Sequence, residues 1–217
     1  VDDQLAACAA TPVGDERTQC WADLDKFLME EVVPWAPRSF TNINGTLRNR
    51  IAKLNGASGA MFSTFDPKPS ASVRTMVLSP SGDRLYVGGA FLEIGGISRP
   101  YLVALDPTTS DVIGPTFELT EAVVFSLDVS PGGEYVYGGI GGTQNRAQSW
   151  NASSGTRRWR ITTDGDVQAV RYADGNLFFG FHDGFEDDTT VKLLAADGVT
   201  GDLVTEFRPA VNGAYGV

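Results

Sequence analysis

At 217 residues, of which 42% are hydrophobic and 20% charged, the chain has the composition of a globular protein and is not disordered throughout. Its formal net charge of −10 makes general binding to nucleic acid or to an anionic membrane surface unfavourable, because carboxylates repel phosphate groups. The sequence contains no run of about 18 apolar residues and therefore predicts no membrane span.

Residues 1–39 have a pattern that predicts a short α-helical N-terminal segment. Asp15 is a candidate N-cap, and Pro34 ends the pattern. Bulky apolar side chains recur on one helical face, at Trp21, Leu24, Phe27 and Leu28. A helix with such a face needs another surface to pack against.

Cys8 and Cys20 are the only cysteines, and both lie in this segment. The single histidine, His182, is distant in sequence, and two thiolates alone rarely satisfy zinc, so a metal site is disfavoured. We predict a local disulfide, with two free thiols as the alternative. A disulfide here would stabilise the fold by about 2–3 kcal/mol and would indicate an oxidising, extracytoplasmic compartment.

Short motifs in the same segment resemble the C-terminal end of family 5 solute-binding proteins, the extracytoplasmic components of peptide ABC transporters. The matching residues are Cys8-Ala9-Ala10, Asp15-Glu16-Arg17, Cys20-Trp21-Ala22-Asp23-Leu24-Asp25 and Leu28-Met29-Glu30-Glu31-Val32-Val33-Pro34-Trp35. In that family the helix is peripheral and does not hold the ligand. The change of pattern at Ser39–Phe40 is abrupt, and a second interpretation is that the two segments do not belong to one natural protein.

From Phe40 onward, short β-strands repeat at a period of roughly 42 to 52 residues, the range of propeller blades. The 25 glycines and 11 prolines of the chain are dispersed, as expected for many strands joined by tight turns. The repeat units span about 40–90, 91–140, 141–181 and 182–217.

Each unit carries recurring markers with a physical role. Ser-Pro-x-Gly turns join two strands at Ser79–Gly82 and Ser130–Gly133. Gly-Gly pairs, at Gly88-Gly89 and Gly138-Gly139, are expected to allow a close backbone approach or a bulge. One aromatic residue recurs per unit and is expected to pack between adjacent sheets: Phe65, Phe117, Trp159 and Phe207.

The predicted fold is mainly β, a partial β-propeller of about three and a half four-stranded blades after the helical segment. The repeat resembles the delta-60 type of bacterial β-propeller repeat, with Phe40, Gly45 and Arg48 answered by Phe91, Gly96 and Arg99. The third unit is closer to the tryptophan-bearing blades of quinoproteins, through Gly155 and Trp159. Fewer than four blades leave a sheet edge open, so we expect self-association or marginal stability.

The densest polar cluster contains His182, Asp183, Glu186, Asp187 and Asp188. We interpret it as a solvated turn, with a cation site as the alternative, because its spacing follows no calcium-loop pattern. A catalytic role for His182 lacks an identifiable nucleophile and an orienting carboxylate.

Other short patterns have plain structural interpretations. Gly138–Gly142 follows a strand but lacks the helix and Lys-Ser/Thr of a phosphate loop, so a repeat turn is expected. The sequons at Asn44 and Asn151 arise readily by chance. The basic cluster of Arg157, Arg158 and Arg160 is interpreted as a solvated face.

The sequence thus predicts a non-catalytic β-propeller module, secreted or at the cell surface, that binds a protein or a glycan without a cofactor. One alternative is the solute-binding protein of a peptide ABC transporter. Another is a fragment of a propeller-scaffold enzyme of the quinoprotein or lactonase-like kind.

Overall fold

The computed structural model describes residues 10, 19–20, 40–43, 46–119 and 122–209. Of the predicted helical segment, only Ala10, Gln19 and Cys20 lie among these residues. The helix as a whole, the boundary at residue 39 and the Cys8–Cys20 disulfide therefore stay predictions. The chain divides into two compact units, residues 1–63 and 64–217, which are described separately.

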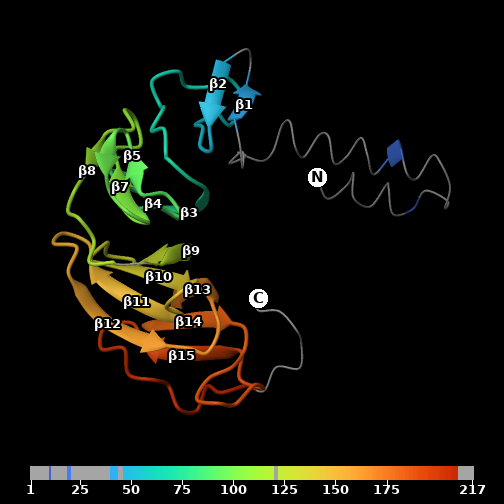
Figure 1. Cartoon of the computed structure of the whole chain (residues 1–217), viewed down its shortest axis with the longest axis vertical. Coiled ribbons are helices and arrows are strands. Elements are labelled where there is room, and N and C mark those ends of the chain that lie inside the picture. The colour runs from blue at the N-terminus through green and yellow to red at the C-terminus, as the bar shows by residue number, and fades with distance from the viewer. Residues whose placement is uncertain (1–9, 11–18, 21–39, 44–45, 120–121, 210–217) are drawn as a thin grey trace. The chain divides into compact units, whose positions relative to one another are not determined.

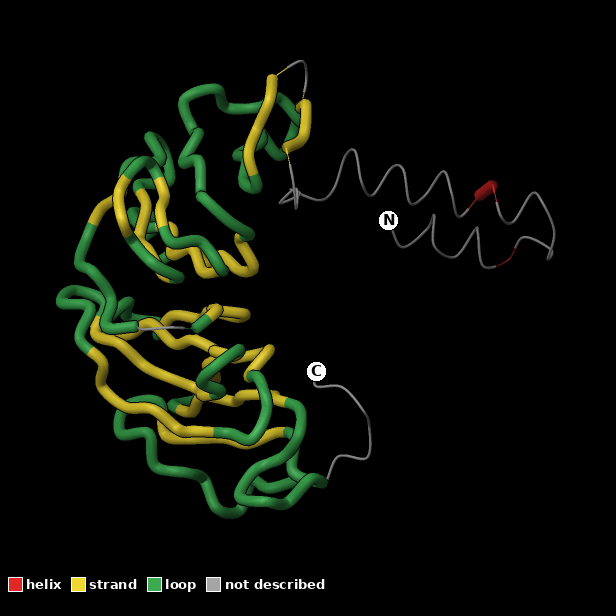
Figure 2. The backbone as a smooth tube through the Cα atoms, viewed as in Figure 1, coloured by secondary structure: helices red, strands yellow, loops and turns green. Residues whose placement is uncertain are grey.

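The second unit consists of antiparallel sheets (Figures 1 and 2). The first sheet contains β3 (Val73–Leu78), β4 (Leu85–Gly89), β7 (Leu102–Leu105) and β8 (Val112–Ile113), in that order. A small hairpin of β5 (Glu93–Ile94) and β6 (Ile97–Ser98) is inserted between β4 and β7.

The second and third sheets repeat this plan. The second contains β9 (Val123–Val129), β10 (Tyr135–Gly141), β11 (Arg146–Asn151) and β12 (Arg157–Thr162). The third contains β13 (Val167–Ala173), β14 (Asn176–Phe181) and β15 (Leu193–Asp197), and a bridge from Ala196 to Leu203 marks the fourth position. The described part of the chain is therefore mainly β, with four-stranded antiparallel sheets as its unit.

The sequence units are offset from these sheets by half a sheet. β3 and β4 come from the end of the 40–90 unit, whereas β7 and β8 come from the start of the 91–140 unit. The second sheet straddles the next unit boundary in the same way. Each of these sheets is therefore built from strands of two consecutive sequence repeats, which are hydrogen-bonded to each other.

Two kinds of turn shape every sheet. The predicted Ser-Pro-x-Gly turns are confirmed between β3 and β4 and between β9 and β10, with Gly82 and Gly133 at φ 75° and 80°. The third and fourth strands are joined by a turn in which an Asp or Asn side chain accepts two backbone N–H groups. This turn recurs at Asp106, Asn151 and Asp197.

Adjacent sheets pack face to face around two apolar clusters. The first lies between the first and second sheets, and Phe117 contacts both Tyr86 and Trp150 in it, with ring centroids 6.1 and 6.2 Å apart. The second lies between the second and third sheets, where Trp159 packs on Tyr137. Phe117 and Trp159 thus lie between sheets, as predicted.

Glycine allows this close packing. A Cβ at Gly88 would lie 2.6 Å from Val124 Cγ1 of the next sheet, and one at Gly139 would lie 2.6 Å from the Val167 carbonyl oxygen. A register shift follows Gly139 in its pairing with β9. The predicted roles of the Gly-Gly pairs, close approach and bulging, are both confirmed.

The first strands of the three sheets, β3, β9 and β13, are neighbours in space and are linked through side chains. Leu127 N–H donates to Thr75 Oγ1 at 3.1 Å, and Val170 N–H donates to Ser126 Oγ at 3.0 Å. Asp128 Oδ2 accepts a further bond from Tyr172 N–H at 2.7 Å. One sheet therefore fixes the position of the next.

The described part of the first unit repeats a stretch of the second. β1 (Phe40–Ile43) and β2 (Thr46–Asn49) form a hairpin like that of β5 and β6. Asn55 makes the same side-chain turn as Asp106, and a bridge between Leu54 and Met61 flanks this turn. The sequence repeat thus begins in the first unit.

Candidate functional site

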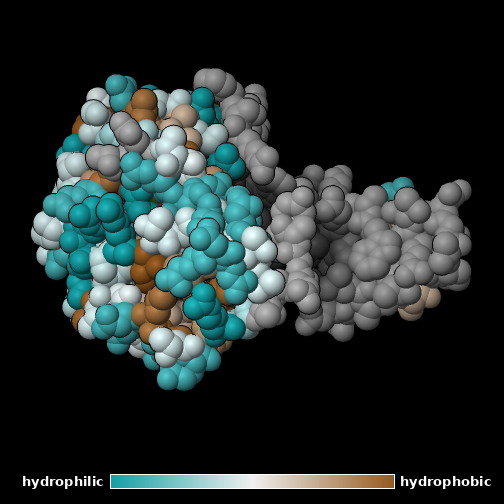
Figure 3. Space-filling view, turned by 60° about the horizontal axis from the view of Figure 1, so that its bottom comes forward, coloured by the Kyte–Doolittle hydropathy of each residue, from teal (hydrophilic) through white to brown (hydrophobic). Residues whose placement is uncertain are grey.

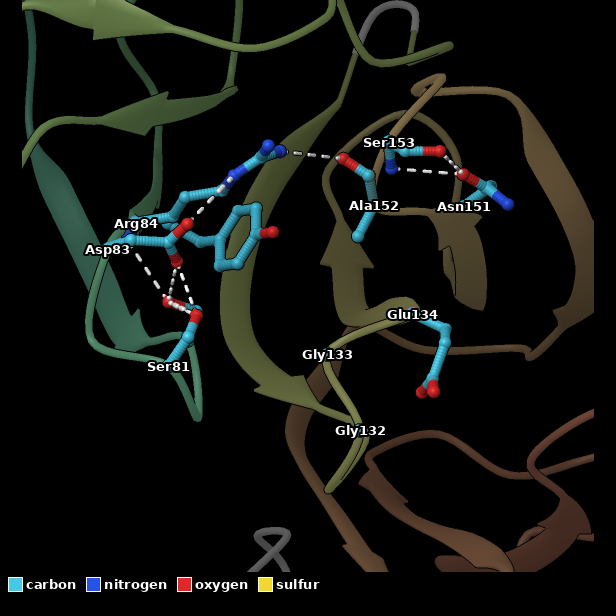
Figure 4. A pocket seen from close by; sticks show the side chains of 11 residues that line it. Ser81, Asp83, Arg84, Gly132, Gly133, Glu134, Asn151, Ala152 and Ser153 are labelled. Carbon is cyan, nitrogen blue, oxygen red and sulfur yellow. Dashed lines mark hydrogen bonds and ion pairs between the residues drawn. The ribbon is translucent and has the colours of Figure 1, made fainter.

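A pocket of about 340 Å³ opens where turns of the first and second sheets meet (Figure 4). Three turns build it: the β3–β4 turn, the β9–β10 turn and the β11–β12 turn. The lining residues are Ser79, Ser81, Asp83, Arg84, Tyr86, Gly132, Gly133, Glu134, Asn151, Ala152 and Ser153. Serine hydroxyls, two carboxylates and one guanidinium group dominate its chemistry.

Asp83 is held by the turn that carries it. Ser79 Oγ donates to Asp83 Oδ1 at 2.8 Å, and Ser81 Oγ donates to the same oxygen. These bonds, that from Ser81 first, lower the pKa of the exposed Asp83 carboxyl group below its usual value. The carboxylate is therefore ionised and oriented at neutral pH.

Arg84 connects the two sheets across the pocket. Its Nη1 donates to the Ala152 carbonyl oxygen at 3.3 Å, and its Nε lies 3.9 Å from Asp83 Oδ2 (Figure 4). On the other side, Glu134 Oε2 accepts a bond from Ser130 Oγ at 3.1 Å. Glu134 occupies in its turn the place that Asp83 has in the equivalent turn.

Asn151 is fixed by its own turn. Its Oδ1 accepts bonds from Ser153 N–H, Ser153 Oγ and Ser154 N–H. Asp106 and Asp197 make the same turn without forming a sequon, so the Asn151-Ala152-Ser153 sequence follows from the repeat.

The pocket lining suits hydrogen bonding. It contains no His or Cys, and its serine hydroxyls at positions 79 and 81 donate to the Asp83 carboxylate. Two carboxylate acceptors and one guanidinium donor thus line the same pocket.

The predicted polar cluster around His182 does not converge on one point. His182 lies between Asp183, with Nδ1 2.8 Å from Oδ2, and Asp166, with Nε2 3.6 Å from Oδ2. Glu186 instead pairs with Arg208 at 3.6 Å, and Asp188 accepts bonds from Thr190.

Asp188 and Asp187 make hydrogen bonds that hold their own loop. The bonds from the Thr190 side chain and backbone lower the pKa of Asp188, and Asp187 N–H donates to Asp164 Oδ2. Within the described residues no group of three or more His, Cys, Asp and Glu side chains is placed to hold a metal ion. The cluster is a hydrogen-bonded loop surface.

The structure also shows where the glycine-rich stretch Gly138–Gly142 and the basic cluster lie. Gly138–Gly141 belong to strand β10, so the turn expected there is wrong for most of the stretch, because this backbone pairs with β9 and β11. Arg158 of the basic cluster stacks on the Tyr135 ring at 3.8 Å, whereas Arg157 and Arg160 are exposed.

No helix among the described residues is long and apolar enough to cross a membrane.

Sequence reasoning did not find the pocket. Its signal was present as the acidic residue that follows each Ser-Pro-x-Gly turn, Asp83 and Glu134. The partner across the pocket, Ala152, lies 68 residues after Arg84, a separation that no local pattern marks.

No protein-family model matches this chain, and no curated protein matches it. Among solved structures it is similar to the hydrazine synthase of Kuenenia stuttgartiensis, with a TM-score of 0.56 and 14% identity over 80% of this chain and 49% of that one. A weaker likeness, with a TM-score of 0.48 and 14% identity, joins 63% of the chain to 39% of U3-55K. The chain therefore spans less than half of either structure, and the likeness to hydrazine synthase is one of fold alone.

Proposed function

We propose that this chain is part of a non-catalytic β-propeller module that binds a glycan in the pocket between its first and second sheets. The propeller interpretation is supported by three successive sheets with the same strand order, joined through their first strands. The similarity in fold to hydrazine synthase covers most of the chain and supports it further.

The observation that carries the glycan proposal is the mixed donor and acceptor lining of the pocket. Asp83 and Glu134 offer carboxylate acceptors, Arg84 offers a charged donor, and Ser153 adds a hydroxyl. A sugar presents alternating hydroxyl groups that act both as donors and as acceptors, so it matches such a lining better than an apolar ligand does. The net negative charge of the chain favours a neutral glycan over an acidic one.

The test is binding of the full chain to a panel of immobilised neutral and acidic oligosaccharides, followed by calorimetric titration with the best binder. Arg84→Gln and Glu134→Gln should each weaken binding by about tenfold, the value of one charge-assisted hydrogen bond. Lys68→Gln is the matched control, because the Lys68 side chain is 70% exposed and lies outside the pocket. Binding to no sugar of the panel, or equal binding by all three variants, would contradict the glycan proposal.

We also infer a place outside the cytoplasm, at the cell surface or in secreted form, from the predicted Cys8–Cys20 disulfide. Mass spectrometry of the protein purified under alkylating conditions tests it: a Cys8–Cys20 peptide should resist alkylation until reduced. Complete alkylation before reduction would contradict the inference.

A further inference from the structure

The side-chain turn recurs four times among the described residues, but its first residue is an amide in only two of them. The four first residues are Asn55, Asp106, Asn151 and Asp197, and in each turn Oδ1 accepts the N–H groups of the second and third residues that follow. Asparagine is chemically labile because the backbone nitrogen of the next residue is able to attack its side-chain carbonyl carbon. The state of that nitrogen therefore decides whether a turn is reactive.

Three of the four turns block this attack. The second turn continues with Pro107, and proline has no N–H to lose. In the third turn, Ala152 N–H donates to the Glu134 carbonyl oxygen at 2.9 Å. In the fourth, Gly198 N–H donates to the Gly175 carbonyl oxygen at 2.8 Å. A hydrogen bond of the fold must therefore break in the third and fourth turns before the nitrogen is available.

The first turn, at Asn55, lacks each of these obstacles. No group of the described residues accepts the Gly56 N–H. A Cβ placed on Gly56 meets nothing within 4 Å, and glycine itself carries no side chain that hinders the attack. Much of the described surface in Figure 3 is hydrophilic, and Asn55 and Gly56 are both exposed, so water reaches them. This turn combines an amide with an unobstructed nucleophile.

The hydrogen bonds of the turn also activate the amide. Asn55 Oδ1 accepts Ala57 N–H and Ser58 N–H, both at 3.0 Å. Negative charge develops on this oxygen when a nucleophile adds to Cγ, and donors fixed on such an oxygen lower the barrier. The two bonds that hold the turn therefore stabilise the tetrahedral intermediate of the attack.

We propose that Asn55-Gly56 is a site of spontaneous deamidation in the folded chain. Hydroxide removes the Gly56 N–H proton, the nitrogen bonds to Asn55 Cγ, and the side-chain nitrogen takes up a proton and leaves as ammonia. Water then opens the resulting succinimide at either of its carbonyl groups, which gives aspartate or isoaspartate at position 55. The net change consumes one water and releases one ammonia, and it needs no oxidant, cofactor or enzyme.

The two products affect the turn differently. Aspartate accepts the same two N–H groups, as Asp197 does in its own turn. Isoaspartate moves one methylene from the side chain into the backbone, so the turn flanked by the Leu54–Met61 bridge loses its geometry. Both products add one negative charge to an exposed position. The reaction therefore changes the charge of the first unit and, through isoaspartate, its local structure.

The experiment is incubation of the full folded chain at mildly alkaline pH, followed by trypsin digestion and peptide mass spectrometry over time. The Asn55 peptide should gain the mass difference between an acid and an amide, and its aspartate and isoaspartate forms should separate by chromatography. The Asn151 peptide is the internal control. The ratio of the Asn55 rate to the Asn151 rate should fall about tenfold in urea, because unfolding releases the Ala152 N–H from its hydrogen bond.

Gly56→Ala is the matched variant, because Gly56 does not have a positive φ and an added Cβ meets open space, so the turn is kept. Its methyl group should slow the reaction at Asn55 by about tenfold. The Asn-Gly pairs at Asn44 and Asn212 lie in other tryptic peptides and do not obscure the signal. An Asn55 that stays intact in the folded chain, a rate ratio that urea leaves unchanged, or an unaffected Gly56→Ala variant would overturn the proposal. None of these outcomes depends on glycan binding.

Discussion

At the scale of single residues, Asp197 shows how the side-chain turn depends on charge. Its Oδ1 accepts N–H bonds from Val199 at 2.8 Å and from Thr200 at 2.7 Å. The bond from the Thr200 backbone, and next that from Val199, lower the pKa of this carboxyl group below 3.8 in the folded chain. The stabilisation of the fold by the ionised Asp197 carboxylate is thus present at pH values above the ordinary carboxyl pKa, and it is lost as the pH falls through the folded pKa.

We therefore expect Asp197→Asn to remove part of the acid sensitivity of the fold. An asparagine accepts the same two bonds, as Asn151 does, so stability at pH 7 should change little. Below about pH 4 the wild-type chain should become less stable than the Asp197→Asn variant, because the wild-type carboxylate becomes protonated and the asparagine does not titrate. Urea unfolding at pH 7 and pH 3 measures this.

The contrasting variant is Asp197→Ala, which loses both bonds and should cost about 1 kcal/mol of unfolding free energy at pH 7. Equal pH dependence in the Asp197→Asn variant and the wild-type chain would show that this turn does not contribute to acid unfolding.

At the scale of elements, strand β10 packs against the third sheet through a position that admits no side chain. A Cβ on Gly139 would lie 2.6 Å from the Val167 carbonyl oxygen and 2.9 Å from Val167 Cγ1. Backbone of a neighbouring strand cannot move aside without loss of pairing, so Gly139→Ala should cost about 3 kcal/mol in thermal or urea unfolding.

Gly132→Ala is the control for that variant. A Cβ there meets only the end of the flexible Glu134 side chain, which is able to rotate away. Its effect should stay within about 0.5 kcal/mol. Similar losses for both variants would mean that glycine is needed for chain conformation and not for close packing.

The markers of the elements could be predicted from the sequence because they are local. The Ser79–Gly82 turn acts through neighbours in the chain, and each glycine pair is a dipeptide that is visible in the sequence although it contacts the next sheet. The strand at which each sheet begins could not be predicted, because a repeat period does not show which strands pair. β4 pairs with β7 across the inserted hairpin of β5 and β6.

The pocket could not be predicted for a related reason. Arg84, Glu134 and Ala152 come from three separate turns, which meet only after two sheets have packed together. His182 has one partner, Asp183, in the acidic run that follows it, but its second, Asp166, comes from the preceding β12–β13 loop. Long-range packing places both sets of residues.

At the scale of the whole molecule, the second sheet is bonded on both sides through its first strand. Leu127 N–H reaches back to Thr75, and Ser126 Oγ accepts the N–H of Val170. Each sheet contacts only its neighbours, so these links decide whether residues 64–217 unfold together or sheet by sheet.

We expect one cooperative transition and additive losses. Thr75→Val and Ser126→Ala each leave one backbone N–H without its side-chain acceptor, which should cost about 1–2 kcal/mol. The two changes share no partner, so the double variant should lose the sum of the two costs. Thr189→Val, at an exposed loop position, should change the unfolding free energy by less than about 0.5 kcal/mol.

Hydrogen exchange read by mass spectrometry supplies the decisive measurement. If the sheets are coupled through β9, Thr75→Val should speed exchange in β13 as well as in β3, although the Thr75 side chain bonds to the second sheet and not to the third. Faster exchange confined to the first sheet, or a melt that splits into two steps, would show that the sheets unfold independently and that the bonds between first strands set geometry without cooperativity.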